Sequence, residues 1–434
     1  MAPERGECLS AAERGAGCSA PPVFVGLSHL GQVFSIGWAL KFGGCAVVDP
    51  NPERLGRFRD GRLTPEEPDL AAAFQASRGH ITVLEHLDAL SAYDTVFVTL
   101  DTPLNLAGEP DVGPVRALIE HIAPALGRGA RLVVVSQVYP GFCARLKSEV
   151  LASRPDLRLV YMVDTLKMGC ALPRFLEPER LIFGVDDSED VPPAFSAFSC
   201  PRFVLTHGQA EMVKMAINLY LLFSVSFANA LDNYCQQFGF GFAPIAPCLR
   251  ADARIGSHAY IAPSLGISGG HLERDLTTVL RTCRDDTTRQ LFQDLLALNR
   301  ERMARLDAAI MEPAAHPVRS VLWIGASYKP ESFSLVNSPC LKFVQAWAGR
   351  LRLSVYDGRY AVPPLEGAER VMDLEAAARA ADCLIFNYGG RGDAERLQRG
   401  WASGIHQLVL DVSLPPSLPP VPSAATGVQV RRIC

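Results

Sequence analysis

Residues 23–49 read VFVGLSHLGQVFSIGWALKFGGCAVVD, an apolar run, a glycine turn, an apolar helix pattern and a second apolar run. Val23–Gly26 predicts a short buried strand, Gly31–Phe42 predicts a helix, and Ala46–Asp49 predicts a second strand that ends in an acid. Strands that alternate with helices imply a parallel sheet with helices on both faces. The stretch therefore predicts an α/β domain that begins at about residue 23.

The glycine turn matches the dinucleotide-binding fingerprint in the context that this motif requires, between a strand and a helix. There the turn places a pyrophosphate on the helix N-terminus, and the acid that ends the second strand binds a ribose hydroxyl. Asp49 is that acid and favours NAD over NADP, because a carboxylate repels a 2′-phosphate, although Arg54 weakens the preference. Serine replaces the middle glycine and crowds the pyrophosphate, so a Rossmann-like domain that has lost its cofactor is the alternative. The turn residues predicted to bind NAD are Gly26, Ser28, Leu30 and Gly31.

The alternation of strands and helices stops at about residue 208 and returns after residue 313. The further buried-strand patterns are Thr95–Leu100, Arg131–Ser136 and Leu181–Val185 in the first half, and Ser320–Ile324, Arg352–Tyr356, Cys383–Asn387 and Gln407–Asp411 in the second. Between the halves, Ala210–Gln237 and Thr277–Leu306 have the apolar spacing of long helices. We predict two Rossmann-like, doubly wound α/β domains joined by a central helical domain with a long spine helix.

The predicted domain boundaries follow these changes of pattern. Residues 1–22 have no apolar core and are expected to form a flexible segment. Residues 23–200 are expected to form the NAD-binding domain, residues 201–312 the central helical domain, and residues 313–434 the second α/β domain. The tail after Ser413 is rich in proline and serine, and we expect it to be extended and partly mobile.

Length and composition bound the class of protein. A chain of 434 residues with 48% hydrophobic and 20% charged residues is ordinary for a soluble protein of two or three domains. A net charge of −4 gives no electrostatic reason to expect nucleic acid or a membrane surface as a partner, and no long apolar run predicts a membrane span. The twelve cysteines form no CxxC pair or zinc-spaced cluster, so we expect no metal site and a cytoplasmic location.

A second glycine-rich stretch, YIAPSLGISGGHLERD, spans Tyr260–Asp275. Gly266, Gly269 and Gly270 have no Cβ and would let the backbone approach a ligand closely. His271 follows them, where such a turn would present a reactive side chain. This loop is therefore a candidate for substrate binding.

The motifs around these residues resemble the UDP-glucose/GDP-mannose dehydrogenase family, over nearly all of residues 23–412. LDTPLNLAGEPDVGPV resembles the family's VPTP…G.PD segment, with Thr102 kept and Asp101 in place of the first proline. SQVYPGF stands where the family has STVPPGT, so Gln137 replaces a threonine near the reacting carbon. The resemblance implies that Thr102 and Gln137 contact the cofactor. MVDTLKMGCALPRFLEPERLIFG resembles SPEFLREGNAL…NPDRIVIG, with Asp164 at the first glutamate position.

On the spine helix, Lys214 and Asn218 match the family's K…N pair and lie one turn apart on one face. The resemblance implies that the lysine stabilises an oxyanion and the asparagine positions the sugar; from the residues alone, a snorkelling lysine and a helix-bridging asparagine are the alternatives. Arg254 matches an arginine that reaches the neighbouring subunit's site, or else forms an interface salt bridge. Tyr260 matches an aromatic residue that contacts the diphosphate. Lys329 is kept in IGASYKPESFSLVNSP, which looks like LGLAFKPNTDDVRESP.

The family's catalytic loop has a cysteine after the glycines and a Lys-Asp pair three residues later, where this chain has His271 and Arg274-Asp275. The resemblance implies a homodimer that oxidises a nucleotide sugar twice with NAD, the second step passing through a thioester on that cysteine. Imidazole acts as a general base or acid near neutral pH and is not an equivalent nucleophile. With Lys214, Asp164 and Asp275 kept as carriers of the chemistry, we expect an NAD-dependent oxidoreductase that acts on a CH–OH group and transfers a single hydride.

The product would then be an aldehyde or ketone, or an epimer if the hydride returns. Two alternatives stay open: a catalytically silent ligand-binding or scaffolding homologue, and full four-electron oxidation by a route that needs no cysteine. The sequence does not identify the sugar or its nucleotide.

Overall fold

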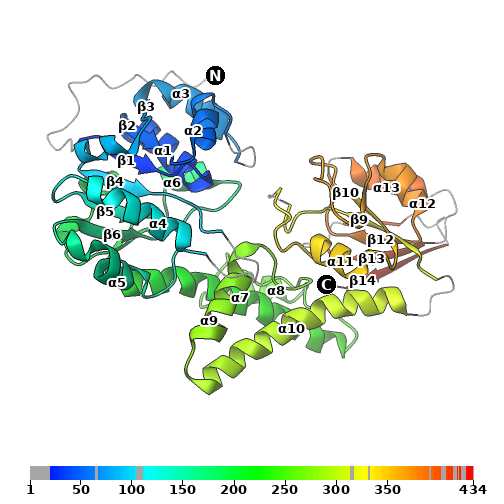
Figure 1. The fold of residues 1–434 in the computed structure, drawn as a ribbon. Coiled ribbons are helices and arrows are strands. Elements are labelled where there is room, and N and C mark those ends of the chain that lie inside the picture. Colours follow the sequence, from blue (N-terminus) through cyan, green and yellow to red (C-terminus); the bar gives the residue numbers. More distant parts are fainter. Residues whose placement is uncertain are drawn as a thin grey trace, which may run out of the picture. The chain divides into compact units, whose positions relative to one another are not determined.

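The computed structural model describes residues 20–63, 67–103, 111–312, 317–330, 333–390, 392–401, 407–413, 418, 420–421 and 427–433. The packing of the chain divides it into two compact units, Met1–Met215 and Ala216–Cys434 (Figure 1). The predicted flexible segment 1–22 lies outside the described residues up to residue 19. The predicted boundaries of the domains stay a prediction.

The first unit is built on an eight-stranded sheet with the order β3-β2-β1-β4-β5-β6-β7-β8. Its strands are β1 (Val23–Val25), β2 (Cys45–Val48), β3 (Ile81–Val83), β4 (Thr95–Val98), β5 (Arg131–Val134), β6 (Arg158–Met162), β7 (Leu181–Gly184) and β8 (Arg202–Leu205). Neighbours are parallel except β6 and β7, which are antiparallel. The prediction of a wholly parallel sheet is wrong at this point, because the link between β6 and β7 does not return the chain to the starting end of the sheet.

Helices cover both faces of this sheet (Figure 1). They are α1 (His29–Phe42), α2 (Pro52–Arg59), α3 (Leu70–Ser77), α4 (Gly113–Ile122), α5 (Phe142–Arg145) and α6 (Ala171–Leu176), with short turns η1 (Arg78–His80), η2 (Leu87–Ala92), η3 (Ala123–Ala125), η4 (Leu146–Val150), η5 (Leu151–Ser153), η6 (Ser188–Asp190) and η7 (Pro193–Ala197). Alternate strand residues supply the two cores, since Val96 and Val98 pack with α4 and Phe97 packs with α1. The doubly wound architecture predicted from the sequence is confirmed.

The spine helix α7 (His207–Gln236) carries the chain from the first unit into the second. Among the described residues, it is the one helix long and apolar enough to cross a bilayer, and 39% of its apolar window is buried. The core helix of a soluble protein has the same properties. Length and composition therefore do not distinguish the two settings.

The second unit contains α8 (Ala246–Ala251), α9 (Gly270–Thr282) and α10 (Asp286–Met311) before its sheet begins. The single helix predicted for Thr277–Leu306 is wrong, since the chain breaks between α9 and α10. Asp285 causes the break by capping α10, where its carboxylate accepts the Thr288 N–H at 2.7 Å.

The second sheet is parallel throughout, with the order β11-β10-β9-β12-β13-β14. Its strands are β9 (Ser320–Ile324), β10 (Arg352–Tyr356), β11 (Glu369–Arg370), β12 (Cys383–Phe386), β13 (Gln407–Asp411) and β14 (Val428–Arg432), and its helices are α11 (Pro339–Trp347), α12 (Leu374–Ala380) and α13 (Asp393–Trp401). The tail predicted to be extended ends in β14, while residues 414–417, 419 and 422–426 lie outside the described residues, and its predicted mobility stays a prediction. The alternation of VQVRR suits that edge position beside β13.

Candidate functional site

The turn between β1 and α1 has two positions that only glycine fits. Gly26 has φ +99°, and a Cβ on Gly31 would lie 1.8 Å from the Gly26 carbonyl oxygen. The Thr99 hydroxyl donates to that same carbonyl at 2.8 Å and holds the turn against the end of β4. The helix N-terminus therefore lies directly beside the strand, as the dinucleotide fingerprint requires.

Asp49 lies buried beneath this turn at the end of β2. Its carboxylate accepts hydrogen bonds from the Leu27 N–H at 2.6 Å and the Asn51 N–H at 2.7 Å, and it pairs with Arg54 at 3.1 Å. These contacts fix the acid where a ribose hydroxyl would meet it. The glycine cradle, the α1 N-terminus and this acid together fit a dinucleotide, with Gly26, Gly31 and Asp49 as the residues that would hold it.

The other residues predicted for the cofactor follow the neighbouring strands. The Ser28 hydroxyl donates to the Thr99 carbonyl at 2.8 Å and accepts the Asp101 N–H at 2.9 Å. The Thr102 hydroxyl donates to the Gln137 carbonyl at 2.6 Å, which joins the segments after β4 and β5. Leu30 packs its side chain into the core, so only its backbone is available to a ligand.

Glu67 is a buried acid in this region that the sequence analysis did not identify. Its carboxylate accepts the Ala171 N–H at 2.6 Å and the Gly169 N–H at 3.2 Å, and lies 3.0 Å from the His29 imidazole. It thus ties the fingerprint turn to the segment that leads into α6. No local pattern marks Glu67, because its partners lie far away in the sequence.

Lys214 and Asp164, two predicted catalytic residues, lie together in the first unit. The Lys214 ammonium donates to the Asp164 carbonyl at 2.7 Å and is 3.6 Å from its carboxylate. Both side chains are largely enclosed, at 13% and 22% exposed. The Lys214 side chain therefore does not snorkel to the surface, which was the alternative weighed from the sequence.

Asn218 and Asp275, two further predicted catalytic residues, lie together in the second unit. The Asn218 amide donates to the Asp275 carboxylate at 2.7 Å, and Arg274 donates to the other oxygen at 3.0 Å. All three residues are buried. One Arg274 nitrogen, Nη2, has no hydrogen-bond partner in the described residues. Asn218 therefore bridges α7 to α9, the alternative weighed from the sequence, and this bond fixes the Asn218 amide against Asp275 in the second turn of α9.

His271 is the second residue of α9, and it is exposed. Gly269 caps the helix with φ +79° and faces the Tyr328 ring, while Gly270 lies near Val336. Asn337 donates to the Gly269 carbonyl at 3.1 Å and secures the turn. The imidazole is thus presented at the beginning of a helix whose first turn is anchored to the second α/β domain.

The structure gives Gly266 a packing explanation. It has φ +110°, and a Cβ there would lie 2.2 Å from the Asn299 side-chain oxygen. The space beside it is therefore taken by Asn299 rather than left open for a ligand. Tyr260 is 57% exposed, and Arg254, with an 89% exposed side chain, pairs with Asp252 at 2.6 Å.

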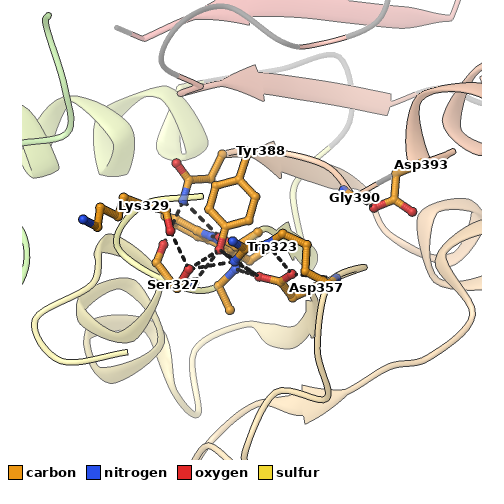
Figure 2. A network of polar contacts seen from close by, with 11 residues as sticks. Trp323, Ser327, Lys329, Asp357, Tyr388, Gly390 and Asp393 are labelled. Carbon is orange, nitrogen blue, oxygen red and sulfur yellow. Dashed lines mark hydrogen bonds and ion pairs between the residues drawn. The ribbon is translucent and has the colours of Figure 1, made fainter. Parts of the chain in front are cut away.

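A polar network that the sequence analysis missed lies at the carboxyl end of the second sheet (Figure 2). Tyr388 accepts the Ser327 N–H at 2.7 Å and donates to Asp357 at 2.8 Å. Asp357 also accepts the Ala326 N–H at 3.0 Å, much as Asp49 accepts the Leu27 N–H. The signal was present, because SVYD ends in an acid as AVVD does.

Burial, with the negative charge of Asp357 beside it, raises the pKa of the Tyr388 hydroxyl, which keeps it protonated as a donor. Arg359 completes the network by donating to that hydroxyl at 2.6 Å. Lys329 joins it through its backbone carbonyl, which accepts the Ser327 hydroxyl at 2.9 Å, whereas its side chain points away (Figure 2).

A cavity of about 400 Å³ opens in the second unit between β9, β10, β11 and α12. It contains none of the predicted site residues. In the part of the chain that the structure describes, no group of three or more His, Cys, Asp or Glu side chains is placed to hold a metal ion. The glycine turns and their neighbours thus remain the candidate site.

Comparison with known proteins matches two domains of one family. Residues 23–197 match the UDP-glucose/GDP-mannose dehydrogenase family, NAD binding domain, and residues 208–301 match the central domain of the same family. The chain is 26% identical to UDP-glucose 6-dehydrogenase of Rhizobium meliloti (strain 1021), over 83% of this chain and 87% of that protein. It is 23% identical to UDP-N-acetyl-D-mannosamine dehydrogenase of Pyrococcus horikoshii, over the same shares.

Among solved structures, the fold is similar to a UDP-glucose dehydrogenase from Pyrobaculum islandicum. The TM-score is 0.79 at 22% identity, over 97% of this chain and 98% of that one. The match to the family's NAD binding domain also supports NAD as the cofactor. The two matched domains together span most of the chain, which is therefore a member of the UDP-glucose/GDP-mannose dehydrogenase family.

Proposed function

We propose that this protein is an NAD-dependent oxidoreductase that acts on a CH–OH group of a UDP- or GDP-linked sugar by a single hydride transfer. The substrate class rests on the family, whose relatives are named for UDP-glucose and UDP-N-acetylmannosamine. The restriction to one transfer rests on one observation. In this chain α9 presents His271 at the position where the family's catalytic loop has a cysteine.

The reaction balances with the groups at hand. NAD supplies the oxidant: the carbinol carbon gives a hydride to NAD⁺, the hydroxyl proton goes to a base, and the products are a carbonyl compound and NADH. His271 is suited to be that base, because an imidazole takes up a proton near neutral pH and the side chain is exposed to the solvent. If the carbinol carbon is secondary, return of the hydride to the other face of the ketone would give an epimer.

In the first unit, Lys214 is the group proposed to stabilise the developing oxyanion. Its ammonium is held by the backbone carbonyl and the carboxylate of Asp164, so a positive charge stays at a fixed point with little solvent around it. A preorganised charge of this kind stabilises negative charge that develops on oxygen. Asp164 thus acts here as the residue that positions Lys214.

In the second unit, Asn218 and Asp275 are proposed to position the sugar. Their mutual hydrogen bond and the Arg274 ion pair hold both side chains in one arrangement. Residues held in this way can orient a hydroxyl without losing further side-chain entropy. The sugar's diphosphate is proposed to lie near Tyr260 and Lys329, by resemblance to the family.

Three thiols of the second unit, Cys283, Cys340 and Cys383, do not offer a substitute for the cysteine that α9 lacks. Burial raises the pKa of Cys383 to about 12 and also raises that of Cys340, so both are inert thiols of the sheet core. Cys283 caps the far end of α9, roughly 18 Å from its first turn at 1.5 Å per residue. This supports a reaction that stops before the acid.

A homodimer and a cytoplasmic location are also proposed. Tyr220, Phe227 and Tyr234 lie seven residues apart on α7 and are all exposed, which suits burial against a second copy. The Arg254 side chain is 89% exposed and pairs with Asp252 of its own turn, and we propose that it reaches a partner subunit, by resemblance to the family. Sedimentation of the purified protein tests the dimer.

The experiment for the proposed reaction is a product balance. Purified protein is incubated with NAD and, separately, UDP-glucose, GDP-mannose and UDP-N-acetylmannosamine; NADH is measured by absorbance, and carbonyl products are trapped with a hydroxylamine. We expect at most one NADH per sugar consumed. Two NADH and a uronic acid would make the proposal wrong. No turnover, together with no thermal shift from NAD, would favour the silent homologue.

A matched pair of variants sharpens this test. His271→Cys places a thiol at the start of α9, and we expect it to form some acid product. His258→Cys places a thiol on an exposed residue outside that helix and should leave the products unchanged. Equal acid formation by both variants would contradict the assignment of His271.

A further inference from the structure

The Asp101 side chain occupies the N-terminus of α1. Its carboxylate accepts a hydrogen bond from the His29 backbone N–H at 3.2 Å. A hydrogen bond from the Leu30 backbone N–H also works to lower the pKa of this carboxyl, against the desolvation that raises it. First-turn amides of this helix are the groups that a bound pyrophosphate uses in a Rossmann turn. In this structure the Asp101 carboxylate therefore occupies the backbone N–H groups that the pyrophosphate of the cofactor would bind.

Ser28 fixes Asp101 in this place. Its hydroxyl accepts the Asp101 N–H at 2.9 Å and donates to the Thr99 carbonyl at 2.8 Å. A glycine at the same position, as in the usual fingerprint, could make neither contact. The serine in the turn and the aspartate after β4 thus form one arrangement, although they are 73 residues apart in the sequence.

The surroundings of the Asp101 carboxyl disfavour its charged form. Desolvation raises the pKa of its carboxyl, and the negative charge of Asp164 adds to this, whereas His29 and the Ser28 hydroxyl lower it. The net direction is upward, so the carboxylate is less favoured here than in water. The His29 imidazole also lies 3.0 Å from the Glu67 carboxylate, which adds a second negative charge to this region. A pyrophosphate, which carries more negative charge, could displace this group.

We propose that Asp101 competes with the cofactor's pyrophosphate for the N-terminus of α1 and thereby sets the affinity of this chain for NAD. Binding of NAD requires the carboxylate to leave the His29 N–H. After it has moved, its charge stays near the pyrophosphate and repels it. The competition acts on the phosphate groups and not on the adenosine part of the cofactor.

The test is calorimetric titration of the full chain with NAD, ADP-ribose and adenosine. Asp101→Asn removes the charge and keeps the shape, and we expect it to bind NAD and ADP-ribose about tenfold more tightly than the wild type, the effect of one like-charge contact in partly solvated surroundings. Adenosine has no phosphate and should bind both proteins equally. Asp88→Asn is the matched control, because it removes the same charge from an exposed residue. Asp88 precedes β4, whereas Asp101 follows β4 and lies beside the N-terminus of α1.

Asp101→Ser provides a second variant in case the first folds poorly, and it should show the same gain for ADP-ribose. Unchanged or weaker binding of NAD by the folded Asp101 variants would overturn the proposal. An equal gain for adenosine would also overturn it, because the effect would then not arise at the pyrophosphate. A gain with Asp88→Asn of similar size would reduce the effect to net charge and equally contradict it.

Discussion

Replacing Asp275 by alanine removes the acceptor that Asn218 and Arg274 share, and it leaves the Arg274 guanidinium buried without a counter-ion. Arg274 is 4% exposed, and its Nη2 already has no hydrogen-bond partner in the described residues. Removal of one partner from a buried ion pair costs about 3–5 kcal/mol. For a unit of this size, that corresponds to a fall of about 6–20 °C in Tm, which scanning calorimetry of the full chain would measure as an earlier transition of the second unit.

Two comparisons make this prediction refutable. Asp252→Ala breaks the exposed Arg254 pair, and we expect only the small change that is typical of surface ion pairs. The double replacement Arg274→Met with Asp275→Leu substitutes an apolar pair for the charged one and should recover the part of the lost stability that comes from the unpaired Arg274 charge, although Asn218 still lacks its acceptor. If Asp275→Ala shifts the transition no more than Asp252→Ala does, the reasoning about a buried pair fails.

Gly31→Ala should abolish measurable NAD binding, because the added Cβ would lie 1.8 Å from a backbone oxygen, whereas Gly56→Ala, which meets nothing within 4 Å, should leave titration with NAD unchanged. Asp49→Ser, with Arg54 retained, should move the ratio of NADP to NAD affinities by about 10–100-fold toward NADP, since one charge-assisted contact is lost and a 2′-phosphate gains a partner; an unaltered ratio would remove the assigned role. Desolvation works to raise the pKa of Asp382, but hydrogen bonds from backbone amides and a serine lower it below its usual value. Stability from this group is therefore present at neutral pH and lost as pH falls below about 4, and urea unfolding of Asp382→Asn should lack this part of the acid sensitivity.

Much of the fold could be predicted because its signals are local. The bounds of β9, β10 and β13 agree with the apolar runs that turn residues delimit. Gly31 and Asp49 could be placed because the fingerprint has steric and hydrogen-bonding reasons at fixed spacing. Local patterns do not give the direction of a strand within its sheet, because this direction depends on packing. The antiparallel pairing of β7 with β6 is an example.

The contacts of the candidate site were less predictable, because they join residues distant in the sequence. The sequence showed that Asp101 replaces a proline, but it could not show that its carboxylate reaches the start of α1. Glu67 and Tyr388 are similar cases, since each meets partners that are distant in the sequence. The loop glycines were predicted to make room for a ligand, but packing explains two of them. A side chain at Gly266 would collide with Asn299, and Gly269 caps α9 with a positive φ.

The number of hydrides that leave the sugar can be counted directly with UDP-glucose and GDP-mannose that carry two deuterons at C6. The wild-type protein is incubated with NAD, and mass spectrometry follows deuterium in the cofactor and in the trapped product. We predict that no more than one deuteron per sugar reaches the cofactor and that the product keeps a carbonyl rather than a carboxylate. Transfer of both deuterons, with a uronic acid as the product, would contradict the role assigned to His271.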